Sequence, residues 1–348
     1  MKNNKYLYIF TFCFGLVQTA SISSNFTLGY DSNPLKYSIS EELLSSNFIG
    51  FSSSLNTKAK IFKKNTRFSF SFKNKFYDNT EKKSNYSLSF KLKQSLGGYQ
   101  FLTFSYSYID DIYLRMYTDV DQGILDYIYT GTDCYFDYSI VKLDYESPYI
   151  VSNKRKIKFN INYIYETQFY NQFFTEFDLK LHGVGVKYLN FNKRNKHSIS
   201  FQNLSADNVT LNDLSLSTSY MDRGYDEFRV KTYFEHKFNK SNKISFTINC
   251  NKREYTSMLD EDQLHIERTH EDIQFLIEYY YKIGDLKNRV SFKNRNRTTT
   301  SPYAWVEDIK TFEVYSINYT IYFKKVEIDN SYPKYILDNL EKYKKWIS

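Results

Sequence analysis

Basic residues recur at every second position along several stretches of this chain, a spacing that would set their charges along one face of a β-strand. They stand between apolar residues: Lys91 lies between Phe90 and Leu92, and Lys158 lies between Ile157 and Phe159. Rows of Lys and Arg facing a watery interior lower the electrostatic barrier for anions and raise it for cations. The residues that we expect to line such an anion path are Arg67, Lys73, Lys91, Lys93, Lys158, Lys180, Arg229, Lys231, Lys293 and Arg295.

A smaller set of carboxylates occupies the same kind of alternate position, namely Glu166, Asp178, Glu235 and Glu278. These carboxylates leave two interpretations open. An open interior with an excess of positive charge would favour anionic solutes. A closed interior would instead use some of the same residues in salt bridges, and several lysines would then only surround one end.

Other carboxylates gather between the alternating stretches, and they could hold Ca²⁺, or Mg²⁺ shared with lipid phosphates. These clusters lack the ordered spacing and the Gly of a dedicated calcium loop, so we predict solvated, self-repelling loops with no metal and no cofactor. The residues concerned are Glu41, Glu42, Asp110, Asp111, Asp119, Asp121, Asp260, Glu261 and Asp262.

Two histidines, His265 and His270, are the candidates for acid–base catalysis, with Asp260, Asp262 and Glu271 nearby in the sequence. Catalysis of this kind needs a base and a nucleophile held together. The chain contains neither a G-x-S-x-G nor an H-E-x-x-H motif. We therefore predict no catalytic residues and no enzyme.

The composition indicates which kind of secondary structure carries these residues. The 348 residues include 35 Tyr and 30 Phe but only 4 Pro, and 25% are charged. Disorder is excluded by the aromatic content, and a bundle of transmembrane helices is excluded by a mean hydropathy of −0.58. Aromatic and β-branched residues that alternate with Ser, Asn and Lys predict β-sheet that is apolar on one face.

The alternating stretches are long for the strands of a soluble sheet, which average about 5 to 6 residues, whereas a tilted strand that crosses a bilayer needs about 9 to 11. An even number of strands is typical of single-chain bacterial barrels. We expect about 14 strands, near residues 22–31, 47–62, 65–78, 84–96, 98–110, 132–147, 155–169, 175–190, 196–206, 225–239, 242–256, 267–283, 286–299 and 311–325.

The connections alternate between short and long, as an up-and-down barrel with short inner turns and longer outer loops requires. All four prolines fall outside the expected strands, at Pro34, Pro148, Pro302 and Pro333. The apolar phase slips near Ile140 to Val141 and again near Gly183 to Val184, and we predict a β-bulge at each place. The predicted fold is all-β: a single transmembrane antiparallel up-and-down β-barrel of about 14 strands.

The two ends of the chain predict further segments. Two lysines, an apolar stretch from Tyr6 to Val17 and small residues at 19–21 have the order of a secretory signal peptide, so we expect residues 1–21 to be removed. The barrel then takes residues 22–325. Residues 326–348 are expected to form a periplasmic tail with a short amphipathic helix after Pro333.

The chain resembles bacterial outer-membrane β-barrel proteins of a porin-like, uncharacterised kind. The resemblance covers residues 1 to 325 and is carried by the run Gly29-Tyr30-Asp31-Ser32-Asn33-Pro34 and by the strand Tyr315 to Phe323, which ends in an aromatic residue like the closing strand of such barrels. In those barrels that aromatic residue is usually the last one, whereas here 25 residues follow. The resemblance implies the outer membrane of a Gram-negative-type bacterium, with the barrel-assembly machinery and membrane lipid as partners.

Together these observations predict a passive channel or transporter for small, preferentially anionic solutes. The alternative is a closed barrel that acts as a structural anchor or surface adhesin. A hydrolase that cleaves lipids or peptides at the outer rim comes third. Nucleic acid is excluded as a partner, in spite of the net charge of +8, by export and by aromatic residues that point to the apolar face.

Overall fold

The computed structural model describes residues 17–38, 44–61, 63–117, 131–152, 154–172, 174, 177–209 and 222–328. Its strands are β1 (Val17–Asp31), β2 (Ser46–Ile61), β3 (Lys64–Tyr77), β4 (Asn85–Gly97), β5 (Gln100–Tyr117), β6 (Thr132–Glu146), β7 (Ile150–Ser152), β8 (Arg155–Tyr170), β9 (Leu179–Phe191), β10 (Asn195–Asn208), β11 (Tyr225–Lys237), β12 (Lys243–Tyr255), β13 (Thr269–Ile283), β14 (Leu286–Thr300), β15 (Phe312–Tyr322) and β16 (Val326–Ile328). A 3₁₀ turn, η1 (Glu81–Lys83), and a short helix, α2 (Ala304–Lys310), lie between strands. None of the helices in these ranges is long and apolar enough to cross a membrane.

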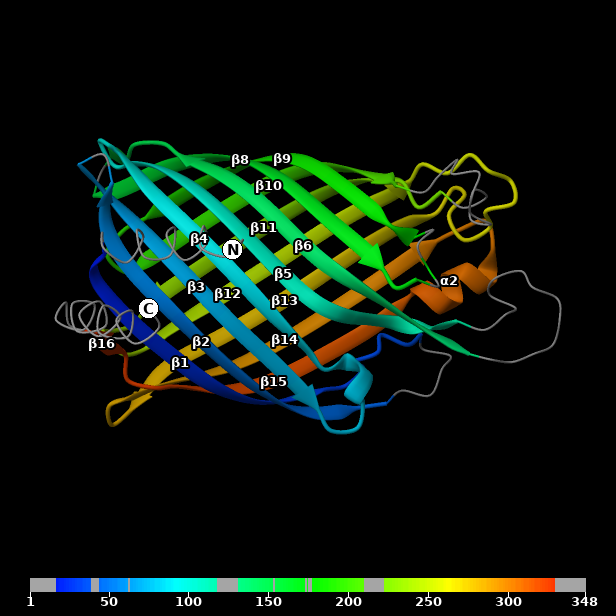
Figure 1. Ribbon diagram of the computed structural model, residues 1–348, viewed down its shortest axis with the longest axis horizontal. Coiled ribbons are helices and arrows are strands. Elements are labelled where there is room, and N and C mark those ends of the chain that lie inside the picture. The colour runs from blue at the N-terminus through cyan, green and yellow to red at the C-terminus, as the bar shows by residue number, and fades with distance from the viewer. Residues whose placement is uncertain are drawn as a thin grey trace, which may run out of the picture.

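The long strands close into one antiparallel barrel of 14 strands, which confirms the predicted fold class (Figure 1). Each strand pairs with its neighbours in the chain, and β15 returns to pair with β1 from Asn25↔Tyr322 to Asp31↔Ser316. Two short strands are additions to this wall: β7 pairs with β8, and β16 pairs with the first part of β1. Among the described residues, the pairing of β15 with β1 closes the sheet without an unpaired edge strand, as a sheet in hydrocarbon requires.

The connections alternate in length as expected. Short turns lie at one end of the barrel, and the longer connections, including α2, lie at the other (Figure 1). The short turns use backbone conformations with positive φ, such as 61° at Lys63 and 56° at Gly284. We call the end with the short turns the inner end and the end with α2 the outer end.

Apolar side chains point outward along the whole wall. Ile161, Val184 and Ile317 have exposed fractions of 60%, 60% and 50%, and on neighbouring strands Phe70 pairs directly with Phe90. Isolated apolar residues on a soluble surface are ordinary, but a continuous outward-facing band is typical of a barrel whose outside meets lipid. Polar residues at the intervening positions therefore face the interior.

The register corrects both predicted bulges. β6 pairs with β8 without interruption from Phe136 to Glu146, so there is no bulge at Ile140. The register shifts lie on β5, between Ile109 and Ile112 and between Tyr113 and Arg115. β9 pairs without interruption on both sides, so the bulge predicted near Gly183 is also wrong. The apparent slip in the alternating pattern arises because the inward positions 183 and 185 are glycines, which carry no side chain to mark the phase. A Cβ at Gly183 would lie 2.6 Å from Leu204 Cγ, so this position has little room for a larger residue.

The predicted ends fall partly outside the described residues. Residues 1–16 of the expected signal peptide lie outside them, whereas β1 begins at Val17 and so contains the last residues of that segment. Of the predicted tail, Val326–Ile328 form β16, and the expected helix after Pro333 lies outside the described part of the chain.

Inside the outer end, on one side, the barrel is packed with apolar residues. Leu179, Leu181, Ala206 and Tyr225 are almost fully buried and form one cluster against Tyr255. Close-packed side chains leave little room for water. Any water-filled space at this level must therefore lie against the other strands.

Replacing Phe201 by Arg tests which side of the wall meets lipid. Phe201 lies in the middle of β10 and points outward, so Phe201→Arg should lower the free energy of unfolding in lipid vesicles by about 2–4 kcal/mol. Ser200 is the adjacent, inward-facing control, and Ser200→Arg should change that free energy by less than about 1 kcal/mol. Guanidinium unfolding of vesicle-inserted protein measures both, and equal losses would contradict the assigned outward face.

Candidate functional site: the barrel interior

Three cavities lie along the interior of the barrel. The central cavity, of about 930 Å³, is bordered by inward residues of β4 to β6 and β8 to β14. The seam cavity, of about 660 Å³, lies where β14 and β15 meet β1, and is also bordered by β2 to β4. The inner-end cavity, of about 740 Å³, is bordered by β1 to β4 and by the segment that contains β16.

Positive charge exceeds negative charge in all three cavities. The central cavity is bordered by eleven Lys and Arg and five Asp and Glu. The seam cavity has seven cations and one carboxylate, Asp31. The inner-end cavity has five cations and one carboxylate, Glu327. An interior of this kind attracts anions and repels cations.

The structure places the ten residues of the predicted anion path as follows. Lys180 lies on β9 in the outward register, next to the outward-facing His182 and Val184. It would face the interior only with a change of phase near Gly183, and β9 has none. The other nine border one or more of the cavities: Arg67, Lys73, Lys91, Lys93, Lys158, Arg229, Lys231, Lys293 and Arg295.

On β6, β8 and β11 to β14, carboxylates neutralise many of the inward cations. Glu166 and Glu227 both bind Arg229, and Glu227 also binds Arg253 at 2.6 Å. Asp272 binds Arg295 at 2.5 Å and Arg297 at 2.9 Å. These pairs hold long side chains in fixed positions, because a buried charge is stable only when it is paired and hydrogen-bonded.

One further carboxylate, Glu146, holds two of the predicted path residues near the inner end. It binds Lys158 at 2.6 Å and Lys93 at 2.5 Å. The ammonium groups of both lysines also lie over the Phe101 ring, at 4.8 and 4.3 Å from its centroid. Lys93 and Lys158 are thus fixed in part by neighbours rather than free to meet a solute.

The wall formed by β1 to β5 is different. Its inward side chains near mid-height are small hydroxyls that bond to one another, such as Ser71 with Ser89 at 2.5 Å and Ser23 with Ser54 at 2.8 Å. Asp31 is the one carboxylate in the sequences of β1 to β4. Arg67, Lys73 and Lys91 point inward here and are nevertheless exposed, so water reaches this wall.

The candidate catalytic residues near Asp262 form a buried cluster in the connection between β12 and β13. The Asp262 carboxylate accepts hydrogen bonds from the Ser257 hydroxyl at 3.1 Å and the Asp222 backbone N–H at 2.8 Å, and it lies 2.8 Å from His265 Nδ1. Burial raises the pKa of Asp262 from 3.8 to about 6 and lowers the pKa of His265 well below 6.5. Ser257 bonds to Asp262 rather than to His265, so this serine is not paired with the base that would activate it.

The remaining catalytic candidates are dispersed. His270 is buried on β13 and borders the central cavity, Glu271 is exposed in the outward register next to it, and Asp260 is exposed in the connection. Neither ring nitrogen of His270 has a hydrogen-bond partner among the described residues. The contacts of Asp262 therefore tie together the connection between β12 and β13 at the outer end.

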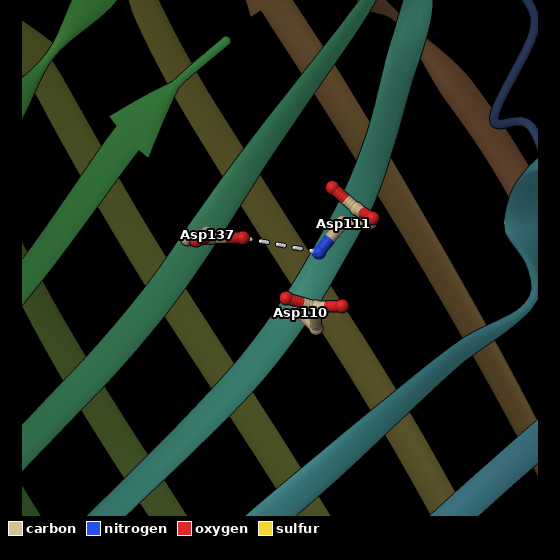
Figure 2. Close-up of side chains that lie close together, drawn as sticks. All are labelled: Asp110, Asp111 and Asp137. Atoms are coloured by element: carbon tan, nitrogen blue, oxygen red, sulfur yellow. Dashed lines mark hydrogen bonds between the residues drawn. The ribbon is translucent and has the colours of Figure 1, made fainter.

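The bulge on β5 creates an acidic cluster that the sequence only partly predicted. Asp110 and Asp111 lie in the bulge, and Asp137 on β6 lies opposite, with the Asp111 N–H donating to Asp137 at 3.2 Å (Figure 2). The Tyr108 hydroxyl contacts Asp110 and Asp137 at 2.7 and 2.8 Å. Exposed carboxylates this close together are common without an ion. Of the other predicted acidic loop residues, Glu41, Glu42, Asp119 and Asp121 lie outside the described ranges.

Comparisons with known proteins do not assign the chain to a family. No protein-family model matches the chain, and no curated protein does. Among solved structures, it is similar to OprD of Pseudomonas aeruginosa (TM-score 0.42, 10% identity, covering 90% of this chain and 95% of that one) and to OpdK of the same organism (0.43, 8%, 89% and 99%). OccK5 (OpdH) of Pseudomonas aeruginosa gives a TM-score of 0.40 at 8% identity, over 90% of this chain and 99% of that one.

The architecture defines the class of protein. An even number of antiparallel strands, closure without an edge, an apolar outside and a charged, hydrated inside together are those of a porin-like outer-membrane β-barrel. The chain is therefore an outer-membrane-type barrel, with a strongly cationic interior as its candidate functional site.

Removing the Asp262 carboxylate tests what the buried cluster does. Asp262→Ala deletes the acceptor of several hydrogen bonds, so the connection from 256 to 268 should lose about 2–3 kcal/mol of local stability. Amide hydrogen exchange at Asp222 and His265 measures this loss. Asp260→Ala, at an exposed position in the same connection, is the control and should leave exchange unchanged; unchanged exchange in both variants would show that the carboxylate does not hold the connection.

Proposed function

We propose that this protein is a passive channel for small, preferentially anionic solutes in the outer membrane of a Gram-negative-type bacterium. The observation that carries the proposal is the excess of cations over carboxylates in all three interior cavities. A low-dielectric wall concentrates the field of such charges within the bore, so anions enrich there and cations are repelled.

The solute path that we propose follows the wall made by β1 to β5. Small hydroxyl side chains leave space beside this wall, whereas the opposite wall is filled by long side chains in salt bridges. The exposed cations on this side have no salt-bridge partner among the described residues: Arg67 and Lys91 towards the inner end, and Lys73 further out. Unpaired cations act on a passing solute more strongly than paired ones, because a bound carboxylate cancels most of their field.

Processing and assembly complete the proposal. Cleavage after residue 20 or 21 would remove the signal segment and leave most of β1 to pair with β2 and β15. The segment from Tyr315 to Phe323, which contains most of β15, would be the strand that the barrel-assembly machinery recognises. Membrane lipid would then cover the outward-facing aromatic and aliphatic side chains.

A closed barrel that serves as an anchor or adhesin remains the alternative, favoured by the apolar cluster at the outer end of β9 to β11. The two functions differ in one measurement, since only a channel conducts ions. A hydrolase is the third interpretation, and it would show as lipid or peptide turnover that is lost in His265→Ala.

Reversing the charge of two cations on the wall made by β1 to β5 tests the proposed path. The wild-type protein in a planar bilayer under a salt gradient should conduct with a reversal potential of the sign expected for anions. In the double variant Lys73→Glu and Lys91→Glu, that potential should shift towards cation preference, because two exposed inward cations become carboxylates.

Lys252→Glu is the matched control for this experiment. Lys252 lies on β12 in the outward register with 55% of its side chain exposed, so its charge is outside the bore. Its substitution should leave the reversal potential unchanged. A wild-type protein without conductance above background would overturn the channel, and a wild-type preference for cations would overturn the anion path.

The pH dependence of selectivity gives a separate prediction. Lys83 lies beside the seam cavity, near Lys36, Arg295 and Asp31, and burial lowers its pKa from 10.5 to about 8. Its positive charge is present below that pH and is lost above it, so anion preference should fall as the pH rises from about 7 to about 9. Reversal potentials across this range measure the change. Lys83→Met should show a weaker preference at about pH 7 and a flatter profile, and an anion preference that rises with pH would contradict the prediction.

A further inference from the structure

The seam cavity gathers lysines from parts of the chain that are distant in sequence. Lys36 comes from the connection after β1, Lys75 from β3, Lys83 from η1 and Lys293 from β14. Closure of the barrel brings them together, because β14 reaches β1 only through β15. A cluster that depends on closure is a property of the folded barrel and not of any single strand.

The structure around the cavity holds these lysines in place. Asn33 is buried and folds the connection inward: its side-chain amide donates to the carbonyls of Tyr37 at 2.8 Å and Glu313 at 3.1 Å, and its oxygen accepts from the Tyr37 N–H. Lys83 Nζ donates to the Tyr113 carbonyl at 3.1 Å, and Lys75 Nζ lies 3.4 Å from the centroid of the Phe48 ring. Lys75 and Lys83 are thus positioned in advance, which lowers the entropic cost of binding.

Carboxylates do not neutralise this cluster. The two arginines that border the cavity are paired elsewhere, Arg295 with Asp272 and Arg289 with Glu278. The lysines Lys36, Lys73, Lys75, Lys83 and Lys293 form no salt bridge with a described residue, and Asp31 is the one carboxylate that borders the space. In the central cavity, by contrast, five carboxylates meet the cations.

The same crowding shifts the pKa values of the lysines outside the membrane-spanning strands. The charge of Lys83 is the main cause that lowers the pKa of Lys36, with burial and the charges of Arg295, Arg297 and Lys293 adding to it. Like charges held this close repel one another. A bound anion would remove that repulsion, so binding and protonation of these lysines favour each other.

We infer that the seam cavity is a binding site for a small oxyanion with two or more negative charges, of the phosphate or phosphate-monoester class. The inference rests on the proposed anion path and makes it specific. The five lysines outnumber the one carboxylate by four, so enough positive charge for a dianion remains even though crowding lowers the pKa of Lys36. Ammonium groups from several directions suit a tetrahedral oxyanion better than a flat, singly charged carboxylate. The cavity volume is within the usual range for small-molecule sites.

Calorimetric titration of the purified full-length barrel in detergent tests this site without depending on conduction. The probes are inorganic phosphate, glycerol 3-phosphate and acetate at equal ionic strength and neutral pH. Both phosphates should bind at least about tenfold more tightly than acetate. In Lys36→Met/Lys83→Met the phosphate affinity should fall by about tenfold or more, whereas Lys36→Arg/Lys83→Arg should retain most of it.

Lys187→Met/Lys196→Met is the matched control, because both lysines point inward and border the central cavity instead. This variant should bind phosphate like the wild type, and guanidinium unfolding should show all variants to be folded. Equal affinity for phosphate and acetate, or equal losses in the seam and central-cavity variants, would overturn the site.

The result also separates this inference from the proposed function. A barrel that conducts anions but binds phosphate no better than acetate would keep the channel and remove the site. A barrel that does not conduct but loses phosphate binding only in the seam variants would keep the site and remove the channel.

Discussion

The hydrogen-bonding needs of the backbone in hydrocarbon constrain everything else in this structure. Every N–H and C=O in the membrane must find a partner within the protein, and a closed antiparallel barrel achieves this with strands. Closure here depends on seven residue pairs between β1 and β15. Once the register is set, alternation along each strand decides which side chains meet lipid and which meet water, so that Phe201 faces outward and Ser200 inward without any further signal.

Two parts of the interior wall, β6 to β14 and β1 to β4, use their charges differently. From β6 to β14, carboxylates such as Glu227 and Asp272 bind two arginines each and fix them. From β1 to β4, the strand sequences contain no carboxylate except Asp31, and short hydroxyl side chains hold the space between the cations. Salt bridges therefore fix the side chains from β6 to β14, whereas the cations from β1 to β4 stand among short hydroxyl side chains with one carboxylate to oppose them.

The sequence predicts what alternation and length determine, and it fails where contacts cross the barrel. The strand count, the closed all-β fold and the alternation of short and long connections follow from local patterns and are confirmed. Lys180 shows the limit: glycines at the inward positions 183 and 185 conceal the phase of β9, so its outward position becomes clear only from pairing with β8 and β10. Asp137 lies close to Asp110 only because the bulge on β5 lies opposite it. The lysine cluster likewise forms only because the connection after β1, with Lys36, and the connection between β3 and β4, with Lys83, fold over the same cavity.

The seam cavity shows how closure and binding chemistry are linked. Ser316 on β15 pairs with Asp31 of β1 on one side and with Lys293 of β14 on the other, so three inward residues form a single row across the seam. Neighbouring strands lie about 4.8 Å apart, which places the Asp31 and Lys293 backbones about 10 Å from each other, with a short hydroxyl side chain between them. Sliding β15 by two residues along β1 would keep every side chain on its own face but move Lys293 by about 7 Å relative to Asp31 and Lys36. The hydrogen bonds of closure therefore set the spacing of the lysine cluster as well as the integrity of the wall, and a barrel closed in another register would have the same charges without the same cavity.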